Sequence, residues 1–250
     1  ALIDTLGVGL AGALEPVSEI ALRLVQETGS RRQSTIWGTQ LATSPAEAAY
    51  TNGIFAHALD FDDSHPHVRG HASAPMTATA LAVGEVTGAS GAAVLAAYAL
   101  GLEVAGKLGR AMGHGHYLRG WHSTSTIGTF SSTAVAGRLW GFNAGEMRTA
   151  FGIAASQVSG LVRNFGTMTK PFHSGRAARA GVMAAWLAKH GHTADESIFD
   201  GKNNVLETYS TGDGASLAEV IGKFGAPWEI LKTGHWVKRW PSCYSNHRAL

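Results

Sequence analysis

Helix-start signals recur along the whole of this 250-residue chain, whereas strand signals are weak. Ser44-Pro45-Ala46-Glu47 has the pattern of a capping box with proline at the first helical position. Asn143 and Glu146 repeat the capping box, and Gly191 is placed as the C-terminal stop of a long helix. No Asn-Gly pair separates two alternating apolar runs, as a β-hairpin would require. The predicted helices are 45–58, 75–87, 91–112, 126–139, 144–160 and 171–190, with short helices after Thr193 and Ser216 and a loop at 113–116.

Glycine is abundant inside these predicted helices as well as between them. The chain has 32 glycines, and some stand at helical spacing, as in Gly7-Val-Gly9-Leu-Ala-Gly12. Each costs a helix roughly 1 kcal/mol relative to alanine but allows a neighbouring helix to approach closely. We therefore expect an all-α fold, with a tightly packed, bundle-like helical domain over residues 1–232 and no independent sheet. The composition becomes less helical after Thr233-Gly234, which marks a possible domain boundary.

Charge and cysteine content exclude several classes of protein. The formal net charge is only +2 and no Lys/Arg cluster is present, so we expect no nucleic-acid partner. No apolar run approaches the roughly eighteen residues of a membrane span, and the apolar segment 1–14 lacks the basic flank of a signal peptide. Cys243 is the single cysteine, which excludes an intrachain disulfide and favours a reducing, cytoplasmic location.

Ionisable side chains are concentrated in one short segment, residues 57–71. It holds three aspartates, four histidines and one arginine, in a chain of which only 15% is charged. Unpaired ionisable groups cost several kcal/mol to bury, so an apolar sequence concentrates them where they pair, bind or react. Pro66 and Gly70 interrupt this segment, so it is not an ordinary solvated helix face. It is the best candidate for one wall of an active site.

Structural roles compete with functional ones for these residues. Asp62 and Asp63 could equally cap the preceding helix or pair with Arg69, whereas Asp60 lies closer to the apolar stretch and is expected to be buried and functional. His57 is expected to be an ordinary core histidine. Solvated loop positions are expected for four other histidines: His65, His67, His114 and His116.

Metal binding and thiol chemistry are weaker hypotheses. His65-Pro-His67 with Asp62 or Asp63 could supply ligands to a divalent ion, but no recognised metal-binding spacing is present, and no metal is expected. Cys243 with His247 suggests a thiol nucleophile, but a lone cysteine is usually inert packing.

Three further segments place a histidine or lysine in a turn beside a predicted helix, where catalytic groups often occur: 120–126, 163–173 and 238–248. Lys170 directly precedes the helix that starts at Pro171. Backbone amides at a helix N-terminus favour anions, so the ammonium group and the helix end are expected to bind a carboxylate or phosphate together.

These segments together resemble the MmgE/PrpD family, which includes 2-methylcitrate dehydratases and cis-aconitate decarboxylases. The matching runs are Asn52-Gly53, His57-Ala-Leu-Asp60-Phe-Asp-Asp63, His71-Ala-Ser, Gly120-Trp-His122, Gly166-Thr-Met-Thr-Lys170, His173-Ser-Gly-Arg-Ala-Ala178 and Tyr244-Ser-Asn-His247-Arg248. The resemblance implies a large helical domain joined to a smaller α/β domain, a homodimer, and no metal or organic cofactor. It also implies that residues 233–250 begin the α/β domain, most of which is absent from this chain.

The resemblance assigns roles residue by residue. It implies catalytic roles for four residues: Asp60, His71, His122 and Lys170. It implies substrate binding by Lys238, Ser64 and Arg163, with Ser64 keeping the hydroxyl where relatives often carry threonine. Ala72 replaces a proline that is common after the histidine of the motif.

The implied activity is that of a cofactor-independent lyase, a hydro-lyase or decarboxylase, on a small di- or tricarboxylic acid such as 2-methylcitrate or cis-aconitate. Lysines on the substrate carboxylate would stabilise the developing charge, and two imidazoles would exchange protons with the substrate. An epimerase or isomerase on the same site, a non-catalytic helical dimerisation or ligand-binding module, and a metal-dependent hydrolase are the alternatives.

Overall fold

The computed structural model describes residues 1–249, and the described part of the chain is almost entirely α-helical. The α-helices are α1 (Leu2–Gly12), α2 (Pro16–Thr28), α3 (Pro45–His57), α4 (Ser73–Thr87), α5 (Gly91–Met112), α6 (Gly115–Leu118), α7 (Ser123–Leu139), α8 (Ala144–Ala155), α9 (Thr169–Lys189), α10 (Val205–Tyr209), α11 (Leu217–Gly222) and α12 (Glu229–Lys232). Two 3-10 turns are η1 (Val162–Asn164) and η2 (Tyr244–Arg248). The strands β1 (Ser34–Thr35) and β2 (Ala42–Thr43) form one small antiparallel ribbon, with Ser34 opposite Thr43. The all-α prediction is confirmed.

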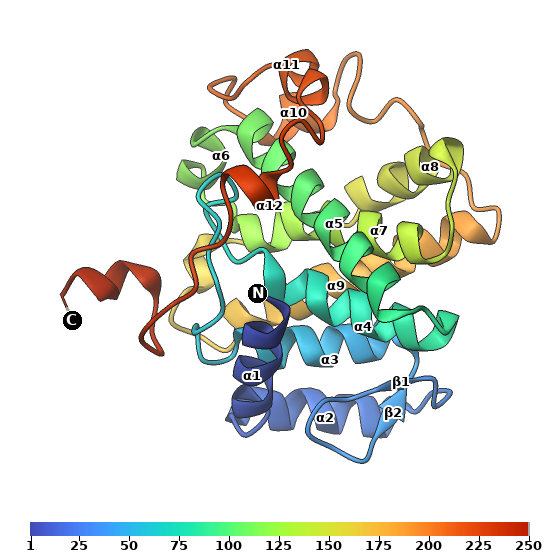
Figure 1. The fold of residues 1–250 in the computed structure, drawn as a ribbon, viewed down its shortest axis with the longest axis vertical. Coiled ribbons are helices and arrows are strands. Elements are labelled where there is room, and N and C mark those ends of the chain that lie inside the picture. The colour runs from blue at the N-terminus through green and yellow to red at the C-terminus, as the bar shows by residue number, and fades with distance from the viewer. Residues whose placement is uncertain (250) are drawn as a thin grey trace.

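Helix α7 lies at the centre of the helical body (Figure 1), where it packs against α4, α5, α8 and α9. Every residue from Ser123 to Gly137 is buried, although many are serine or threonine. Some of their hydroxyl groups are satisfied within the helix: Thr129 and Thr133 each donate at 2.8 Å to the carbonyl group four residues earlier. Small side chains of this kind allow neighbouring helices to surround α7 on all sides.

Glycine contacts bring α3 and α9 together, as the glycine content predicts. A Cβ atom on Gly53 would lie 2.9 Å from the Cα atom of Gly175, closer than a real side chain tolerates. Helix α3 therefore lies almost backbone to backbone on α9, and the C-terminal end of α3 meets the N-terminal half of α9 in the interior. The α1–α2 pair and the β ribbon cover the other side of α3 (Figure 1).

Several predicted helix ends differ from the observed ones. Helices α4 and α7 start two and three residues earlier than predicted, at Ser73 and Ser123. Helix α8 ends at Ala155 rather than near Gly160, because the Gln157 carbonyl accepts a hydrogen bond from Arg176 instead of continuing the helix.

Two of the short predicted segments are wrong. The segment 113–116 is not simply a loop, since α6 begins at Gly115. Within the described residues no helix starts at Thr193, where Asp195 instead accepts hydrogen bonds from Ser197.

The two predicted capping boxes have different outcomes. At α8, Asn143 and Glu146 exchange side-chain to backbone hydrogen bonds of 3.0 and 2.8 Å, as predicted. At α3, the Ser44 side chain makes no capping hydrogen bond. Glu47 instead pairs with Arg179 of α9 at 2.6 Å, so tertiary contact replaces the local cap.

Among the described residues, α5 alone has the length and hydropathy of a membrane-spanning helix. This is weak evidence for a span, because 56% of the relevant window is buried inside the protein and a core helix passes the same test. Helix α5 also carries the buried charged residues Glu103 and Lys107.

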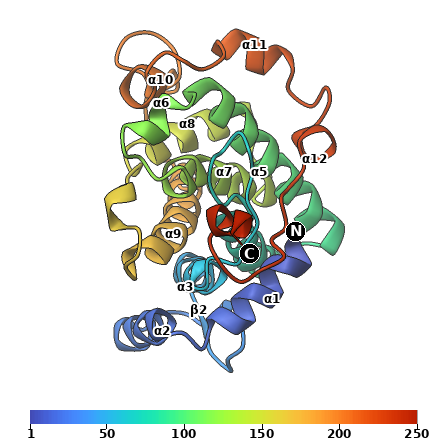
Figure 2. The same cartoon turned by 90° about the vertical axis from the view of Figure 1, so that its left-hand side faces the viewer.

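The last part of the chain runs back beside the α3–α4 loop, residues 58–72. Trp236 forms an antiparallel bridge with Ser64, and the two segments lie side by side in Figure 2. Beyond this bridge η2 extends away from the helical body (Figure 1). The boundary near residue 233 stays a prediction, and Leu250 lies outside the described residues.

Candidate active site

The α3–α4 loop folds back on itself and carries most of the ionisable cluster. Asp60 has a φ of 51°, a left-handed conformation that aspartate tolerates better than most residues, and it turns the chain sharply after α3. His65 and Gly70 then pair as an isolated bridge, with a backbone hydrogen bond of 3.0 Å. This closed loop returns the chain to His71, so that His71 lies beside the end of α3.

The carboxylate of Asp60 is surrounded by positively charged or protonatable groups. Lys170 Nζ lies 2.5 Å from Oδ2, while Lys238 Nζ and His71 Nε2 lie 3.1 and 3.2 Å from Oδ1. Lys238 also donates to the Asp60 backbone carbonyl. Burial opposes ionisation of Asp60, but His71, His57 and the two lysines outweigh it and lower its pKa to about 2. We call these four residues the Asp60 cluster: Asp60, His71, Lys170 and Lys238. The two ammonium groups exceed the charge of its one carboxylate.

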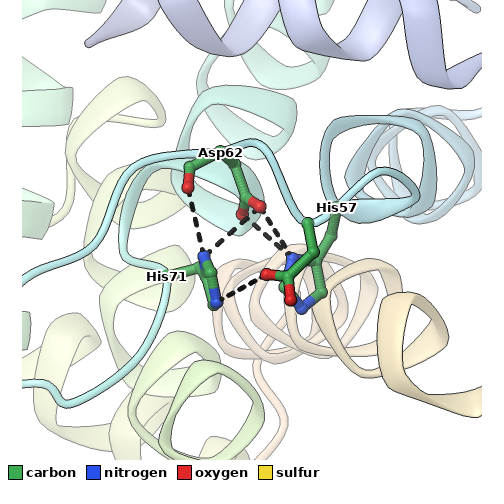
Figure 3. Close-up of side chains that lie close together, drawn as sticks. His57, Asp62 and His71 are labelled. Atoms are coloured by element: carbon green, nitrogen blue, oxygen red, sulfur yellow. Dashed lines mark hydrogen bonds and ion pairs between the residues drawn. The ribbon is translucent and has the colours of Figure 1, made fainter. Parts of the chain in front are cut away.

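Asp62 holds two imidazoles in place, as Figure 3 shows. Its carboxylate lies 2.9 and 3.0 Å from His57 Nδ1 and 3.3 Å from His71 Nδ1. Burial opposes ionisation of Asp62, but His57 and His71 hold its pKa well below the usual range. His71 Nδ1 also lies 2.9 Å from the Asp63 carbonyl oxygen, which can only accept, so this nitrogen carries a proton.

Asp63 has a different set of partners from Asp62. Its carboxylate accepts from Ser73 Oγ at 2.5 Å and lies 2.5 Å from His235 Nδ1. Tyr98 joins Ser73 and His235 through its hydroxyl group, at 2.5 and 3.0 Å. These contacts fix the start of α4 against α5 and the C-terminal segment.

The ring of His122 is in contact with the ring of His173. Their Nδ1 atoms are 2.9 Å apart, so one ring donates and the other accepts. Burial, followed by His57 and His71, holds the pKa of His122 well below 6.5, and burial with Arg176 lowers the pKa of His173 to about 4. Both rings are therefore neutral at pH 7. The ring of Phe165 packs edge-on against His122, with the centroids 4.7 Å apart.

Two adjoining cavities, of about 260 and 580 Å³, open onto these groups. Ser64, His71 and His122 line the smaller, and His57 and Asp60 line the larger. Three residues border both: Phe165, Lys170 and Cys243. A ligand that spans the two cavities would therefore meet Lys170, Asp60, His71 and His122, whereas Lys238 borders neither cavity.

The structure brings together most of the residues that the sequence marks as catalytic or substrate-binding. The Asp60 carboxylate is in direct contact with three of them: Lys170, His71 and Lys238. Ser64 and His122 line the adjoining cavity. Arg163 is not at the site: it is exposed and borders neither cavity.

Some structural roles expected from the sequence are wrong. Asp62 and Asp63 are completely buried against imidazoles rather than capping α3 or pairing with Arg69. Asp60, expected to be the most buried of the three, keeps 21% of its side chain exposed.

Some of the predictions for histidines are also wrong. His65 and His116 are each only 1% exposed and are not solvated loop residues, whereas His114 is exposed as expected. His57 is buried, but its Nε2 has no hydrogen-bond partner, so it is not a fully satisfied core histidine. His173 and His235 carry no pattern of their own in the sequence, and only the fold shows their contacts.

By residue type alone, four side chains at the site could bind a metal ion. Atoms of His57, Asp60, Asp62 and His71 lie within 4.8 Å of one another. This set differs from the His65/His67 set that the sequence suggests. Lys170 and Lys238 are already paired with the Asp60 carboxylate, at 2.5 and 3.1 Å. Two ammonium groups so close to a candidate ligand would repel a divalent cation. The group is better suited to an anionic ligand.

Comparison with known proteins gives consistent matches. Residues 1–218 match the MmgE/PrpD N-terminal domain. Human cis-aconitate decarboxylase is 34% identical over 204 residues, which cover 80% of this chain and 42% of the relative. The mouse cis-aconitate decarboxylase is 33% identical over 224 residues, or 86% and 46%. The cis-aconitate decarboxylase-like protein oryM of Aspergillus oryzae is 28% identical over 242 residues, or 91% and 50%. The chain thus spans about half the length of the curated relatives it matches.

Proposed function

This chain belongs to the MmgE/PrpD family, and from that premise we propose that it forms the helical part of a lyase acting on a small tricarboxylic acid. Decarboxylation of a cis-aconitate-like substrate is the reaction that we favour, because the matched relatives carry that name. Dehydration of a 2-methylcitrate-like acid would use the same groups.

The observation that supports this proposal is the surplus of positive charge around Asp60. Two ammonium groups and His71 share one carboxylate at the edge of the two cavities. A substrate carboxylate that enters would be held by Lys170, which borders both cavities, in a partly desolvated site where charge-assisted hydrogen bonds are strong. Lys238 is fully buried and borders neither cavity, so it would act through Asp60 and through its positive charge.

His71 and His122 have surroundings that suit different protonation states. His71 has Nδ1 facing a backbone carbonyl and Nε2 facing a carboxylate, an arrangement that suits the doubly protonated ring and a proton donor. His122 is held neutral by burial and its neighbours, which suits a proton acceptor or a neutral hydrogen-bond donor.

Loss of carbon dioxide breaks a carbon–carbon bond and leaves an electron pair delocalised into the remaining unsaturated acid. The two lysines would stabilise this charge, and His71 would then deliver a proton to carbon. In the dehydration, His122 would remove the proton next to a carboxylate and His71 would protonate the departing hydroxyl group. The protonation states therefore serve both reactions.

Lys170→Met tests the proposal in a protein of the relatives' full length that contains these 250 residues. Loss of one charge-stabilising donor should lower kcat/KM about 100-fold or more on the active substrate. Lys202→Met is the matched control, because Lys202 is exposed and borders no cavity of the site. Normal turnover by Lys170→Met would contradict the proposal.

A substrate panel separates the candidate activities. Cis-aconitate, 2-methylcitrate and citrate are assayed in parallel, by carbon dioxide release and by absorbance of the conjugated alkene. Carbon dioxide release from cis-aconitate supports decarboxylation, and alkene absorbance from a hydroxy acid supports dehydration. Binding of these acids without turnover of any of them would favour a ligand-binding module instead.

A further inference from the structure

A separate cavity of about 390 Å³ adjoins the α3–α4 loop away from His122 and Lys170. Five cationic side chains border it: Arg69, Lys107, Arg110, Lys223 and Lys232. Three carboxylates also border it: Asp213, Glu219 and Glu229. Cations therefore outnumber carboxylates along its wall, and two histidines, His67 and His114, add protonatable groups.

All three carboxylates are already occupied by groups of the protein. Glu229 is 1% exposed and lies 3.1 Å from Lys107 Nζ and 3.0 Å from Arg110 Nε. Burial opposes ionisation of Glu229, but hydrogen bonds from Arg110, Thr233 and Lys107 lower its pKa to about 2. Because it stays ionised and paired, Glu229 neutralises its own partners and no others.

The other two carboxylates also have partners, although Asp213 is held by backbone N–H groups and not by a cation. Glu219 pairs with Lys223 at 2.9 Å, and Asp213 accepts the backbone N–H groups of His114 and Gly115 at 2.8 and 2.9 Å. Within residues 1–249, by contrast, the exposed side chains of Arg69 and Lys232 make no ion pair. The cavity therefore has cationic groups that no protein carboxylate satisfies.

His67 reports the same imbalance. Its pKa is lowered first by burial and next by Arg110; Glu229 acts in the opposite direction, but Arg69 and Lys107 add to the lowering. A protonated imidazole is thus disfavoured here because the surrounding field is positive. An anion in the cavity would reverse that effect.

Glycines of α5 bring the segments around the cavity close together. Gly106 and Gly109 stand three residues apart, which places them on one face of the helix, and Gly109 borders the cavity. A Cβ atom on Gly106 would lie 2.6 Å from Glu229, and one on Gly109 would collide with the His67 carbonyl. The bare face of α5 thus lets α12 and the α3–α4 loop converge on the cationic residues of α5.

We propose that this cavity binds a small anion carrying two or more negative charges, a phosphate compound or a polycarboxylate, through Arg69 and Lys232. Arg69 stands two residues before His71, and its backbone N–H is bonded to the His65 carbonyl at 2.9 Å. The anion would therefore contact the loop that carries His71. The proposal does not depend on the lyase activity, but Arg69 also borders the smaller active-site cavity, so Lys232 is the residue that distinguishes the two sites.

Titration calorimetry with pyrophosphate and, separately, citrate tests the proposal on this chain and two variants. Lys232→Glu should weaken binding about tenfold or more, because it replaces attraction with repulsion at the anion. Lys202→Glu, the matched control, makes the same change of net charge at an exposed position that does not border the cavity, and should change the affinity less than about twofold. Tight binding of one probe only identifies the phosphate or the carboxylate class.

The active site is a second place where these anions can bind, so the titrations are repeated in Lys170→Met. Binding that persists there and is lost in Lys232→Glu supports the proposal. Equal weakening by Lys232→Glu and Lys202→Glu, loss only in Lys170→Met, or no binding by either probe would overturn it. As an independent readout, NMR titration of the His67 ring should show its pKa rising when the anion is bound, and an unchanged value would contradict the site.

Discussion

Asp60, Asp62 and Asp63 are near neighbours in the sequence but have different partners. Asp60 faces the two lysines, Asp62 faces imidazoles, and Asp63 faces Ser73 and His235. Asp62 is completely buried, and it fixes the ring orientation of both His57 and His71. Such a carboxylate acts on the reaction only through the imidazoles that it holds.

Asp62→Asn is expected to destabilise the fold by about 1–3 kcal/mol, because a buried, charge-assisted hydrogen-bond network loses its negative charge. The free energy of unfolding is measured by urea denaturation. Asp200→Asn is the control, since Asp200 is exposed and makes no ion pair among the described residues, and its effect should stay within about 0.5 kcal/mol. Equal stability of the two variants would show that Asp62 is not a structural centre of the site.

The six long helices predicted from the sequence all form, but α4, α7 and α9 start two or three residues early, α8 ends five residues early, and α1 and α2 are not among the predicted helices. The box at Asn143 forms as predicted, and α5 follows the Ser90 cap. The box at Ser44 does not form, because Glu47 is drawn to Arg179 of a helix more than a hundred residues away. Local patterns thus predict a helix end reliably only where no distant charge competes for the capping residue.

Glycine positions inside the helices are predicted to differ in what a methyl group does. Gly53→Ala places a Cβ atom 2.9 Å from Gly175 and should cost about 1–3 kcal/mol by forcing α3 away from α9. Gly7→Ala has no atom within 4 Å of the new Cβ and should stabilise the chain, by up to about 1 kcal/mol, through helix propensity. Thermal unfolding of both variants checks the opposite signs. A stabilising Gly53→Ala would mean that the α3–α9 contact is looser than described.

At the scale of the whole molecule, the candidate site residues were easier to predict from the sequence than the contacts that they make with one another. The residues of the α3–α4 loop, Lys170 and Lys238 are recognisable as candidates because ionisable groups are rare in this chain. The pairing of Asp60 with Lys238, 178 residues away, depends on the bridge between Ser64 and Trp236. His173 meets His122 only because α7 and α9 are packed together. Such pairings follow from helix packing, which no local pattern encodes.

Buried neutral histidines also make the stability of the whole chain depend on pH. The fold lowers the pKa of five of them, first through burial: His57, His65, His116, His122 and His173. Above pH 6.5 these rings are neutral in both the folded and unfolded chain and have no effect. Below pH 6.5 the unfolded chain takes up protons that the folded chain does not, so stability falls as the pH falls. For His65 and His173, whose pKa values are about 4, this loss continues to about pH 4.

We expect the free energy of unfolding to decrease between pH 7.5 and pH 5, before the carboxylates titrate. His65 alone should contribute about 2 kcal/mol of that loss by pH 5, since its pKa falls from 6.5 to about 4 on folding. A second loss, from Asp60 with its pKa of about 2, should follow only below about pH 4, where the unfolded carboxyl group begins to bind a proton. Urea denaturation at pH 7.5, 6, 5 and 3.5 separates the two stages. His65→Gln should reduce the first-stage loss by about 2 kcal/mol, the share of that one ring, whereas His192→Gln, at an exposed position, should leave it unchanged. A stability that stays constant from pH 7.5 to pH 5 would mean that these imidazoles are protonated in the folded chain.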